Sequence, residues 1–209
     1  MNILVLGANG KVGSLVVKEL SKTEYSIRAF IHGKNLLPEY KNVTFFQGDI
    51  YNQESLRQAL KDIDIVISCL GSWGTKRKDV LSVAMKNIIP LMESTGCNRI
   101  ISLTGSEAQV KEEKIGIIQR LTHPIFKLLA GKILFDGEEH LRLLQSSNLN
   151  WTVVRSPVMN NVGKPGKFQL KNKYPLPFRT INRHSVAISL VNQIEDEAFI
   201  NSAPYIFRK

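Results

Sequence analysis

Gly7-Ala8-Asn9-Gly10-Lys11-Val12-Gly13 stands directly between the apolar run Ile3-Leu4-Val5-Leu6 and a helical pattern that starts at Leu15. A strand, a glycine turn and a helix start in this order are typical of dinucleotide-binding units. One glycine permits the turn, one lets backbone N–H groups approach a pyrophosphate, and one lets the helix pack closely on the strand. The spacing is G-x-x-G-x-x-G rather than G-x-G-x-x-G, so an ordinary strand-to-helix turn is the alternative. We expect a cofactor whose phosphates lie at the positive end of the helix, in contact with Gly7, Asn9, Gly10, Lys11, Val12 and Gly13.

Composition favours one domain over residues 1–209, because a chain of this length that is 43% hydrophobic can bury one substantial core. No apolar run reaches the length of about 18 residues that a membrane span needs, and no basic region precedes the first apolar run. We therefore expect no membrane span, no signal peptide and a cytoplasmic location. Cys69 and Cys97 lack C-x-x-C spacing, so we expect both to be small buried hydrophobes.

Apolar runs alternate with helical patterns along the chain, which predicts a parallel sheet covered by helices on both faces. The fold class is therefore α/β, a doubly wound, mostly parallel, Rossmann-like sheet in a single domain. Ligands of such sheets bind beyond the carboxyl ends of the strands. We expect strands at 2–6, 26–31, 43–47, 64–69, 99–103, 151–155 and about 204–207, and helices at about 11–21, 53–61, 79–95, within 112–148, and at 183–195.

The end of the second expected strand indicates which nicotinamide cofactor is bound. An acidic residue there accepts hydrogen bonds from the ribose hydroxyls of NAD, whereas a basic residue accommodates the extra phosphate of NADP. The sequence Phe30-Ile31-His32-Gly33-Lys34 contains no carboxylate. We therefore expect NADP(H), with Lys34 as the charge partner and His32 as a weaker, pH-dependent one. NAD(H) is the alternative if both are only solvated turn residues.

A segment of about 156–182 is basic and loop-rich. No Asp or Glu occurs between Arg155 and Arg183, and four prolines, Pro157, Pro165, Pro175 and Pro177, lie among the cations. Three interpretations are open: a lid on the substrate side that attracts an anionic ligand, a nucleic-acid patch, or a solvated loop. The first would use Lys167, Lys171 and Lys173, and the second, which we favour least, would stack bases on Phe168, Tyr174 and Phe178. The formal net charge of +10 admits either partner.

Several runs together resemble the atypical short-chain dehydrogenases/reductases. These are the glycine turn, Ile27-Arg28-Ala29-Phe30-Ile31-His32, Gly48-Asp49, Leu70-Gly71, the Trp-Thr-Val-Val-Arg run at 151–155, and Ile181-Asn182-Arg183-His184-Ser185-Val186-Ala187. More narrowly, the chain looks like the NAD(P)H-binding group that contains the NmrA-like proteins and the flavin reductase also called biliverdin reductase B. The resemblance covers nearly the whole chain in order.

The resemblance implies roles for residues outside the glycine turn. Asp49 and Ile50 would flank the adenine, Leu70 and Gly71 would line the middle of the cofactor, and Thr104 would approach the nicotinamide. Two positions depart from the family pattern: His32 stands where arginine is common, and Arg155-Ser156-Pro157 replaces a more usual Arg-Pro. The second departure places Pro157 in a reshaped nicotinamide pocket.

The mechanism depends on a missing tyrosine. Better-known short-chain dehydrogenases use Tyr-x-x-x-Lys as proton donor between the fifth and sixth strands, but no tyrosine occurs from Asn52 to Lys173. Tyr205 and Lys209 match the spacing, yet we expect them to lie beyond the sheet. Carbonyl reduction needs a general acid, worth about 10²–10⁴-fold, whereas a flavin or quinone delocalises the added electrons and takes its proton from solvent.

We therefore expect an NADPH-dependent oxidoreductase that passes hydride to a flavin, a quinone or a similar planar small-molecule acceptor. Thr104 and Lys132 are the candidate catalytic residues, although Lys132 also fits a solvated helix position. The alternative is a non-catalytic redox sensor of NmrA-like type that reports cofactor level to a protein partner. Epimerase chemistry is disfavoured by the same missing tyrosine. The sequence does not indicate an oligomeric state.

Two further expectations concern the long helical region. His123 and His140 are expected at the surface, and no histidine pair has metal-ligand spacing, so we expect no metal. The helical spacing of the apolar residues there is typical of a stripe that faces the core, and a helix lying on a membrane is the alternative. The stripe comprises Ile117, Leu121, Ile125, Phe126, Leu128 and Leu129.

Overall fold

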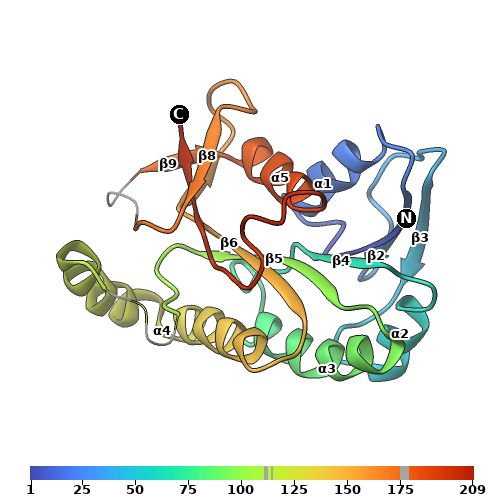
Figure 1. The fold of residues 1–209 in the computed structure, drawn as a ribbon, viewed down its shortest axis with the longest axis horizontal. Coiled ribbons are helices and arrows are strands. Elements are labelled where there is room, and N and C mark those ends of the chain that lie inside the picture. The colour runs from blue at the N-terminus through green and yellow to red at the C-terminus, as the bar shows by residue number, and fades with distance from the viewer. Residues whose placement is uncertain (111–112, 114, 175–178) are drawn as a thin grey trace.

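The computed structural model describes residues 1–110, 113, 115–174 and 179–209. An eight-stranded sheet runs through the molecule in the order β3-β2-β1-β4-β5-β6-β10-β8. The pairings within this sheet are parallel, except that β8 lies antiparallel to β10. This is the doubly wound, Rossmann-like single domain that the alternation of patterns predicts (Figure 1).

The expected strands and helices are confirmed to within a few residues at their ends. The strands of the main sheet are β1 (Asn2–Leu6), β2 (Ser26–Ile31), β3 (Val43–Gln47), β4 (Ile65–Ser68), β5 (Arg99–Gly105), β6 (Asn150–Ser156), β8 (Phe168–Lys171) and β10 (Tyr205–Arg208). The helices are α1 (Gly13–Leu20), α2 (Gln53–Ala59), α3 (Val80–Thr95), α4 (Ile117–Gln145) and α5 (Arg183–Asn192).

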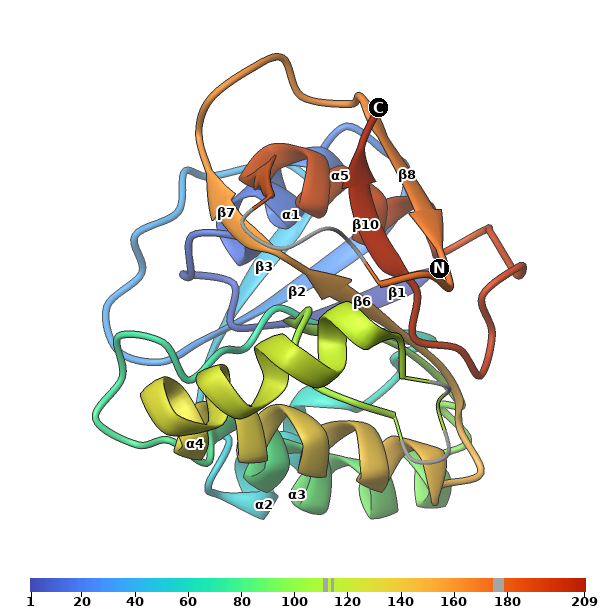
Figure 2. The same cartoon turned by 90° about the vertical axis from the view of Figure 1, so that its left-hand side faces the viewer.

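Helices cover both faces of the sheet. In Figures 1 and 2, α1 and α5 lie against one face, and α2, α3 and α4 lie against the other. Each face has its own apolar core, because successive side chains of a strand point to opposite faces: Leu4 and Leu6 belong to the core under α3, and Ile3 and Val5 to the core under α1. The central strands are therefore apolar throughout, as strands of a parallel sheet are.

The direction of winding reverses between β1 and β4. The chain runs outward from β1 through β2 to β3, then returns to β4 beside β1 and continues outward through β5 and β6. Ligands of doubly wound sheets bind at such a switch point, beyond the carboxyl ends of the strands. The glycine turn follows β1 at this place.

The basic segment contains more regular structure than its composition predicts. Two short strands, β7 (Val158–Asn160) and β9 (Thr180–Asn182), pair in parallel, and β8 forms the edge of the main sheet. These strands have three or four residues each, too few for a readable alternation. Lys167, Lys171 and Lys173 are exposed at or beside β8. Pro175, Pro177 and Phe178 lie outside the described residues.

Helix α4 differs most from expectation. It bends at Ala130, where φ is −142° and ψ is 34°, six residues after Pro124. The expectation of a core-facing stripe is wrong: five of its six residues (Ile117, Leu121, Ile125, Leu128 and Leu129) are 57–86% exposed. Among the described residues, no helix is both long enough and apolar enough to cross a bilayer.

Candidate functional site

The glycine turn is closed by close backbone approaches that a side chain would prevent. Gly7 has a φ of +72°, and the N–H of Gly10 donates to its carbonyl at 2.9 Å. A Cβ on Gly13 would lie 2.1 Å from the Gly7 carbonyl oxygen, and one on Gly7 would lie 3.1 Å from the Cys69 carbonyl oxygen. The glycines thus let the chain turn tightly between β1, β4 and α1.

The start of α1 fits an anionic group. Val12 occupies the N-cap position without a side-chain cap, and no acidic residue stands in the first turn. Amide N–H groups and the positive end of the helix dipole therefore face the switch point without a competing carboxylate. These features fit the pyrophosphate of a dinucleotide, and Gly10, Lys11, Val12 and Gly13 are the residues that would hold it.

Asn9 joins the glycine turn to the loop after β2. Its Nδ2 donates to the carbonyl oxygen of Lys34 at 2.9 Å, and its Oδ1 accepts from the N–H of Leu36 at 3.3 Å. Asn9 is thus a scaffold of this loop as well as a candidate cofactor contact. His32 and Lys34 are both exposed at the carboxyl end of β2, where a cation can reach a phosphate on the adenosine ribose.

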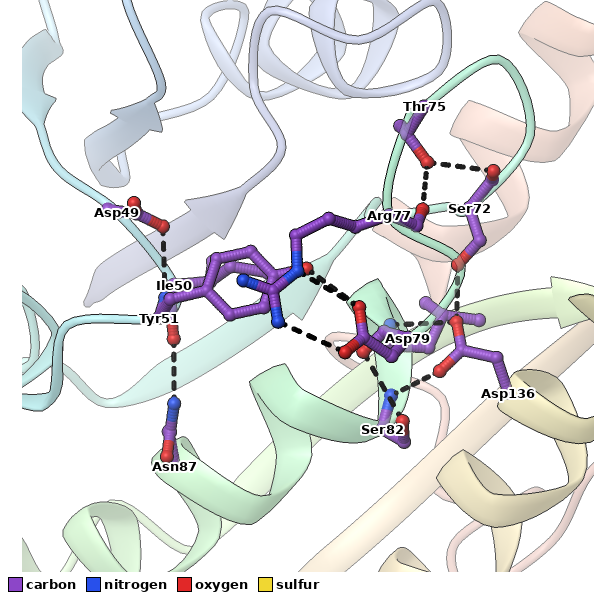
Figure 3. A network of polar contacts seen from close by, with 11 residues as sticks. Asp49, Ile50, Tyr51, Ser72, Thr75, Arg77, Asp79, Ser82, Asn87 and Asp136 are labelled. Atoms are coloured by element: carbon purple, nitrogen blue, oxygen red, sulfur yellow. Dashed lines mark hydrogen bonds and ion pairs between the residues drawn. The ribbon is translucent and has the colours of Figure 1, made fainter. Parts of the chain in front are cut away.

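The loop after β3 forms a polar cluster with the loop after β4 (Figure 3). Asp49 accepts a hydrogen bond from the Tyr51 N–H at 3.0 Å, and the Arg77 guanidinium lies 3.6 Å from the Tyr51 ring centroid. Arg77 also pairs with Asp79 at 3.1 Å and lowers the pKa of that carboxyl. Ile50 is buried beside this cluster. Arg77 and Tyr51 thus adjoin the expected adenine site, although no sequence pattern marks either residue.

A buried carboxylate holds this loop against two helices. Asp136 of α4 is 1% exposed and accepts from the N–H groups of Leu81 at 3.0 Å and Ser82 at 2.8 Å, and from the Ser72 hydroxyl. It therefore caps α3 from a different helix (Figure 3). Local sequence gave no signal for this role, since Asp79 occupies the N-cap position and makes no side-chain cap hydrogen bond.

The two predicted catalytic residues differ in their exposure. Thr104 is 7% exposed in β5, and a Cβ on Gly137 of α4 would lie 2.8 Å from its Oγ1. The Thr104 hydroxyl therefore faces the helix that covers it. Lys132 is exposed on α4. Leu70 and Pro157 are half-buried and Gly71 is exposed, at the ends of β4 and β6.

A buried ion pair lies beside the ends of β5 and β6. Arg155 is 2% exposed and makes two hydrogen bonds to Glu113, at 2.6 and 2.7 Å, while its guanidinium lies 3.7 Å from the Tyr205 ring centroid. Tyr205 is fully buried and accepts from the Gln119 amide at 3.3 Å. The expectation that Tyr205 lies beyond the sheet is therefore wrong, because β10 pairs with β6 beside Arg155.

A second tyrosine joins this cluster from the basic segment. The Tyr174 ring meets the Tyr205 ring edge-on, with centroids 5.6 Å apart, and its hydroxyl donates to Glu107. Thr122 lies 3.0 Å from the same hydroxyl. Burial, and next the bond to Glu107, raise the pKa of Tyr174; burial raises the pKa of Tyr205. Both hydroxyls are thus engaged within the protein.

His140 is also buried, which corrects the expectation of a surface position. Its Nε2 lies 2.8 Å from the Ser102 hydroxyl, and desolvation lowers its pKa to about 4. His123 is half-buried and lies 2.8 Å from Glu138. Cys69 and Cys97 are buried as expected, and desolvation raises the pKa of Cys69 to about 12, so its thiol stays protonated at neutral pH.

A hollow of about 680 Å³ adjoins the glycine turn on the side of α1. Its walls come from the start of α1, the start of α5 and the stretch after β7. Of the described residues of the basic segment, Asn161, Gly163, Pro165 and Asn182 line this hollow. Phe168 packs on the apolar core and Tyr174 belongs to the cluster above, which argues against stacking of bases on either. No group of three or more potential metal ligands is found in the ranges that the structure describes.

Comparison with known proteins agrees with this geometry. A profile of the NAD(P)H-binding family matches residues 7–197. A 2-alkyl-3-oxoalkanoate reductase from Shewanella oneidensis is 30% identical over 170 residues, which cover 74% of this chain and 42% of the relative. An isoflavone reductase-like protein from Olea europaea is 35% identical over 80 residues, 33% of this chain and 26% of the relative. The chain thus spans less than half the length of these relatives.

Solved structures share the fold over almost the whole chain. The oxidoreductase ylbE from Lactococcus lactis has a TM-score of 0.82 at 20% identity and covers 100% of this chain and 91% of its own. ChuY, an anaerobilin reductase from Escherichia coli, has a TM-score of 0.79 at 18% identity, with 100% and 97% covered. A Veillonella parvula short-chain dehydrogenase/reductase solved with NADP has a TM-score of 0.79 at 19% identity, with 98% and 93% covered. With its glycine turn, its switch point and a profile match over residues 7–197, the chain belongs to the NAD(P)H-binding family.

Proposed function

We propose that the protein is an NADPH-dependent oxidoreductase that delivers hydride to a flavin, a quinone or a similar planar acceptor. The observation that carries the proposal is the tight glycine turn followed by a helix start without cap or carboxylate. The bound nicotinamide would supply the hydride. The names of the relatives above, a 2-alkyl-3-oxoalkanoate reductase and an isoflavone reductase-like protein, also support reduction.

The choice of acceptor follows from the surroundings of the Tyr174 and Tyr205 hydroxyls, the candidate proton donors. The Tyr174 hydroxyl donates to Glu107 and Tyr205 is fully buried, so neither presents a proton to a bound substrate. A planar acceptor that draws its proton from water needs no such donor. The task of the protein is then to position two rings. We assign Thr104 and Pro157 to the nicotinamide end, Leu70 and Gly71 to the middle, and Asp49 and Ile50 to the adenine end.

Lys34 and His32 would select NADPH over NADH. Replacement of Lys34 by Gln removes a charge beside the expected phosphate, and a charge-assisted contact is worth about 1.5–3 kcal/mol. We expect the preference for NADPH over NADH, measured as the ratio of kcat/KM values, to fall about tenfold. Lys41→Gln is the matched control, because Lys41 is an exposed cation two residues before β3 rather than at the end of β2.

The first assay is oxidation of NADPH, with NADH in parallel, against flavin mononucleotide, riboflavin and small quinones. Turnover that prefers NADPH supports the reductase. Cofactor binding without turnover on any acceptor would favour the redox sensor instead. An equal loss for NADPH and NADH in Lys34→Gln would contradict the phosphate role of Lys34. Lys132→Gln tests the candidate catalytic role of Lys132. Because Lys132 is exposed, we expect it to be a solvated residue whose replacement leaves turnover unchanged.

A further inference from the structure

The first half of α4 carries an apolar surface that faces solvent. Figure 1 shows this half projecting at one end of the molecule, beyond the sheet. On an ordinary protein surface, exposed large apolar side chains are scattered singly, whereas several lie together here. We call this surface the outer face of α4; it comprises Ile117 (76% exposed), Leu121 (68%), Ile125 (57%), Leu128 (86%) and Leu129 (78%).

Polar bonds fix this outward orientation. The opposite side of the same half-helix carries Gln119, which bonds to Tyr205; Thr122, which bonds to Glu107; and His123, which lies 2.8 Å from Glu138. Gln119 is 1% exposed. A surface helix ordinarily buries its apolar side and exposes its polar side. Here the arrangement is reversed, and rotating the helix would leave several buried polar groups without partners.

The sequence around the outer face of α4 contains cationic residues but no acidic ones. From Ile115 to Phe135 the sequence contains Arg120, Lys127 and Lys132 but no Asp or Glu, and all three cations are exposed. The loop after β4 adds two exposed residues, Trp73 (70%) and Lys76, and its Asp79 is paired with Arg77. That loop adjoins the second half of α4, because Ser72 donates to Asp136.

We propose that the outer face of α4, with Trp73, binds the surface of an anionic lipid bilayer. Apolar side chains would enter the boundary between headgroups and acyl chains, and the flanking cations would meet lipid phosphates. Tryptophan is suited to this boundary because its ring is apolar and its N–H is polar. A second copy of the chain fits the charges less well, since pairing two such faces would place Arg120, Lys127 and Lys132 against the same cations of the other copy.

Co-sedimentation with vesicles tests the proposal on the full chain. We expect binding to phosphatidylcholine vesicles that contain about a third phosphatidylglycerol, and weaker binding to phosphatidylcholine alone. Leu121→Gln with Leu128→Gln should weaken the anionic binding at least about tenfold, because two exposed apolar anchors are lost. Arg120→Gln with Lys127→Gln should weaken it and reduce its sensitivity to salt. Val162→Asn is the control, since Val162 is 71% exposed but lies between residues that line the hollow beside α1.

Three results would overturn the proposal. One is absence of binding to the anionic vesicles. Another is equal vesicle binding by the Leu121/Leu128 double variant and the unmodified chain, which would show that the binding comes from the overall positive charge. The third is a dimer in sedimentation equilibrium that the double variant dissociates, without lipid binding, which would make a second copy the occupant. Far-UV circular dichroism and thermal melting establish that each variant is folded.

Discussion

At the scale of the residue, Gly13 is where one methyl group should have the largest effect on binding. An alanine Cβ would lie 2.1 Å from the Gly7 carbonyl oxygen and 2.9 Å from the Ala8 Cα. Both are backbone atoms, so the glycine turn must shift. We expect Gly13→Ala to weaken NADPH binding about tenfold or more, measured by titration of cofactor fluorescence, and to destabilise the fold by about 1–3 kcal/mol.

The matched control is Gly131→Ala, because a Cβ on Gly131 of α4 meets nothing within 4 Å. This variant should bind cofactor as the unmodified chain does. Unchanged cofactor affinity in a folded Gly13→Ala protein would show that the close approach at the turn does not shape the binding site.

At the scale of the element, α3 depends on a carboxylate from α4. Asp136→Ala removes the acceptor for the Leu81 and Ser82 N–H groups and for the Ser72 hydroxyl. Because these donors are buried, we expect the free energy of unfolding in urea to fall by about 3 kcal/mol. Asp79→Ala, at the N-cap position itself, should cost less than about 1 kcal/mol, since that side chain makes no cap bond. A larger loss for Asp79→Ala than for Asp136→Ala would contradict the assignment.

At the scale of the whole molecule, the buried His140 makes stability depend on pH. The unfolded histidine takes up a proton near pH 6.5, but the folded one does so only near pH 4, because burial disfavours its charged form. The unfolded state therefore binds more protons between these values, and stability falls as pH falls through this window. The neighbouring Asp136 opposes the shift without cancelling it.

We expect this group to contribute a loss of about 2 kcal/mol in the free energy of unfolding between pH 7 and pH 5. Urea denaturation at the two pH values measures it. His140→Gln should lose most of this dependence, whereas His32→Gln, at an exposed position, should retain it. An identical pH dependence in His140→Gln and the unmodified chain would exclude His140 as its source.

The sheet and the glycine turn were predictable because their signals are local. One short window contains the strand Ile3-Leu4-Val5-Leu6, the glycine turn and the start of α1 at Gly13, because the three are consecutive. The positions of the loops after β2 and β3, which contain Lys34 and Asp49, follow from the same strand pattern. The three short strands between β6 and α5 were missed, since three or four residues give no clear period.

The polar clusters could not be predicted in this way. Asp136 caps a helix that begins 56 residues earlier, and Tyr174 and Tyr205 meet although 31 residues separate them. No local pattern records such partners. The expectation of a surface position for His140 failed for the same reason, because its Ser102 partner comes from β5.

The sequence by itself determined the doubly wound sheet, the glycine turn at its switch point and membership of the NAD(P)H-binding family, because each rests on the periodicity or order of neighbouring residues. Only the tertiary structure decided which side of α4 meets the protein. Helical spacing shows that Leu121, Ile125 and Leu128 share a side, but not what that side contacts. Gln119 and Thr122 on the opposite side find buried partners in Tyr205 and Glu107. Those bonds turn the polar side inward and leave the apolar side to face solvent.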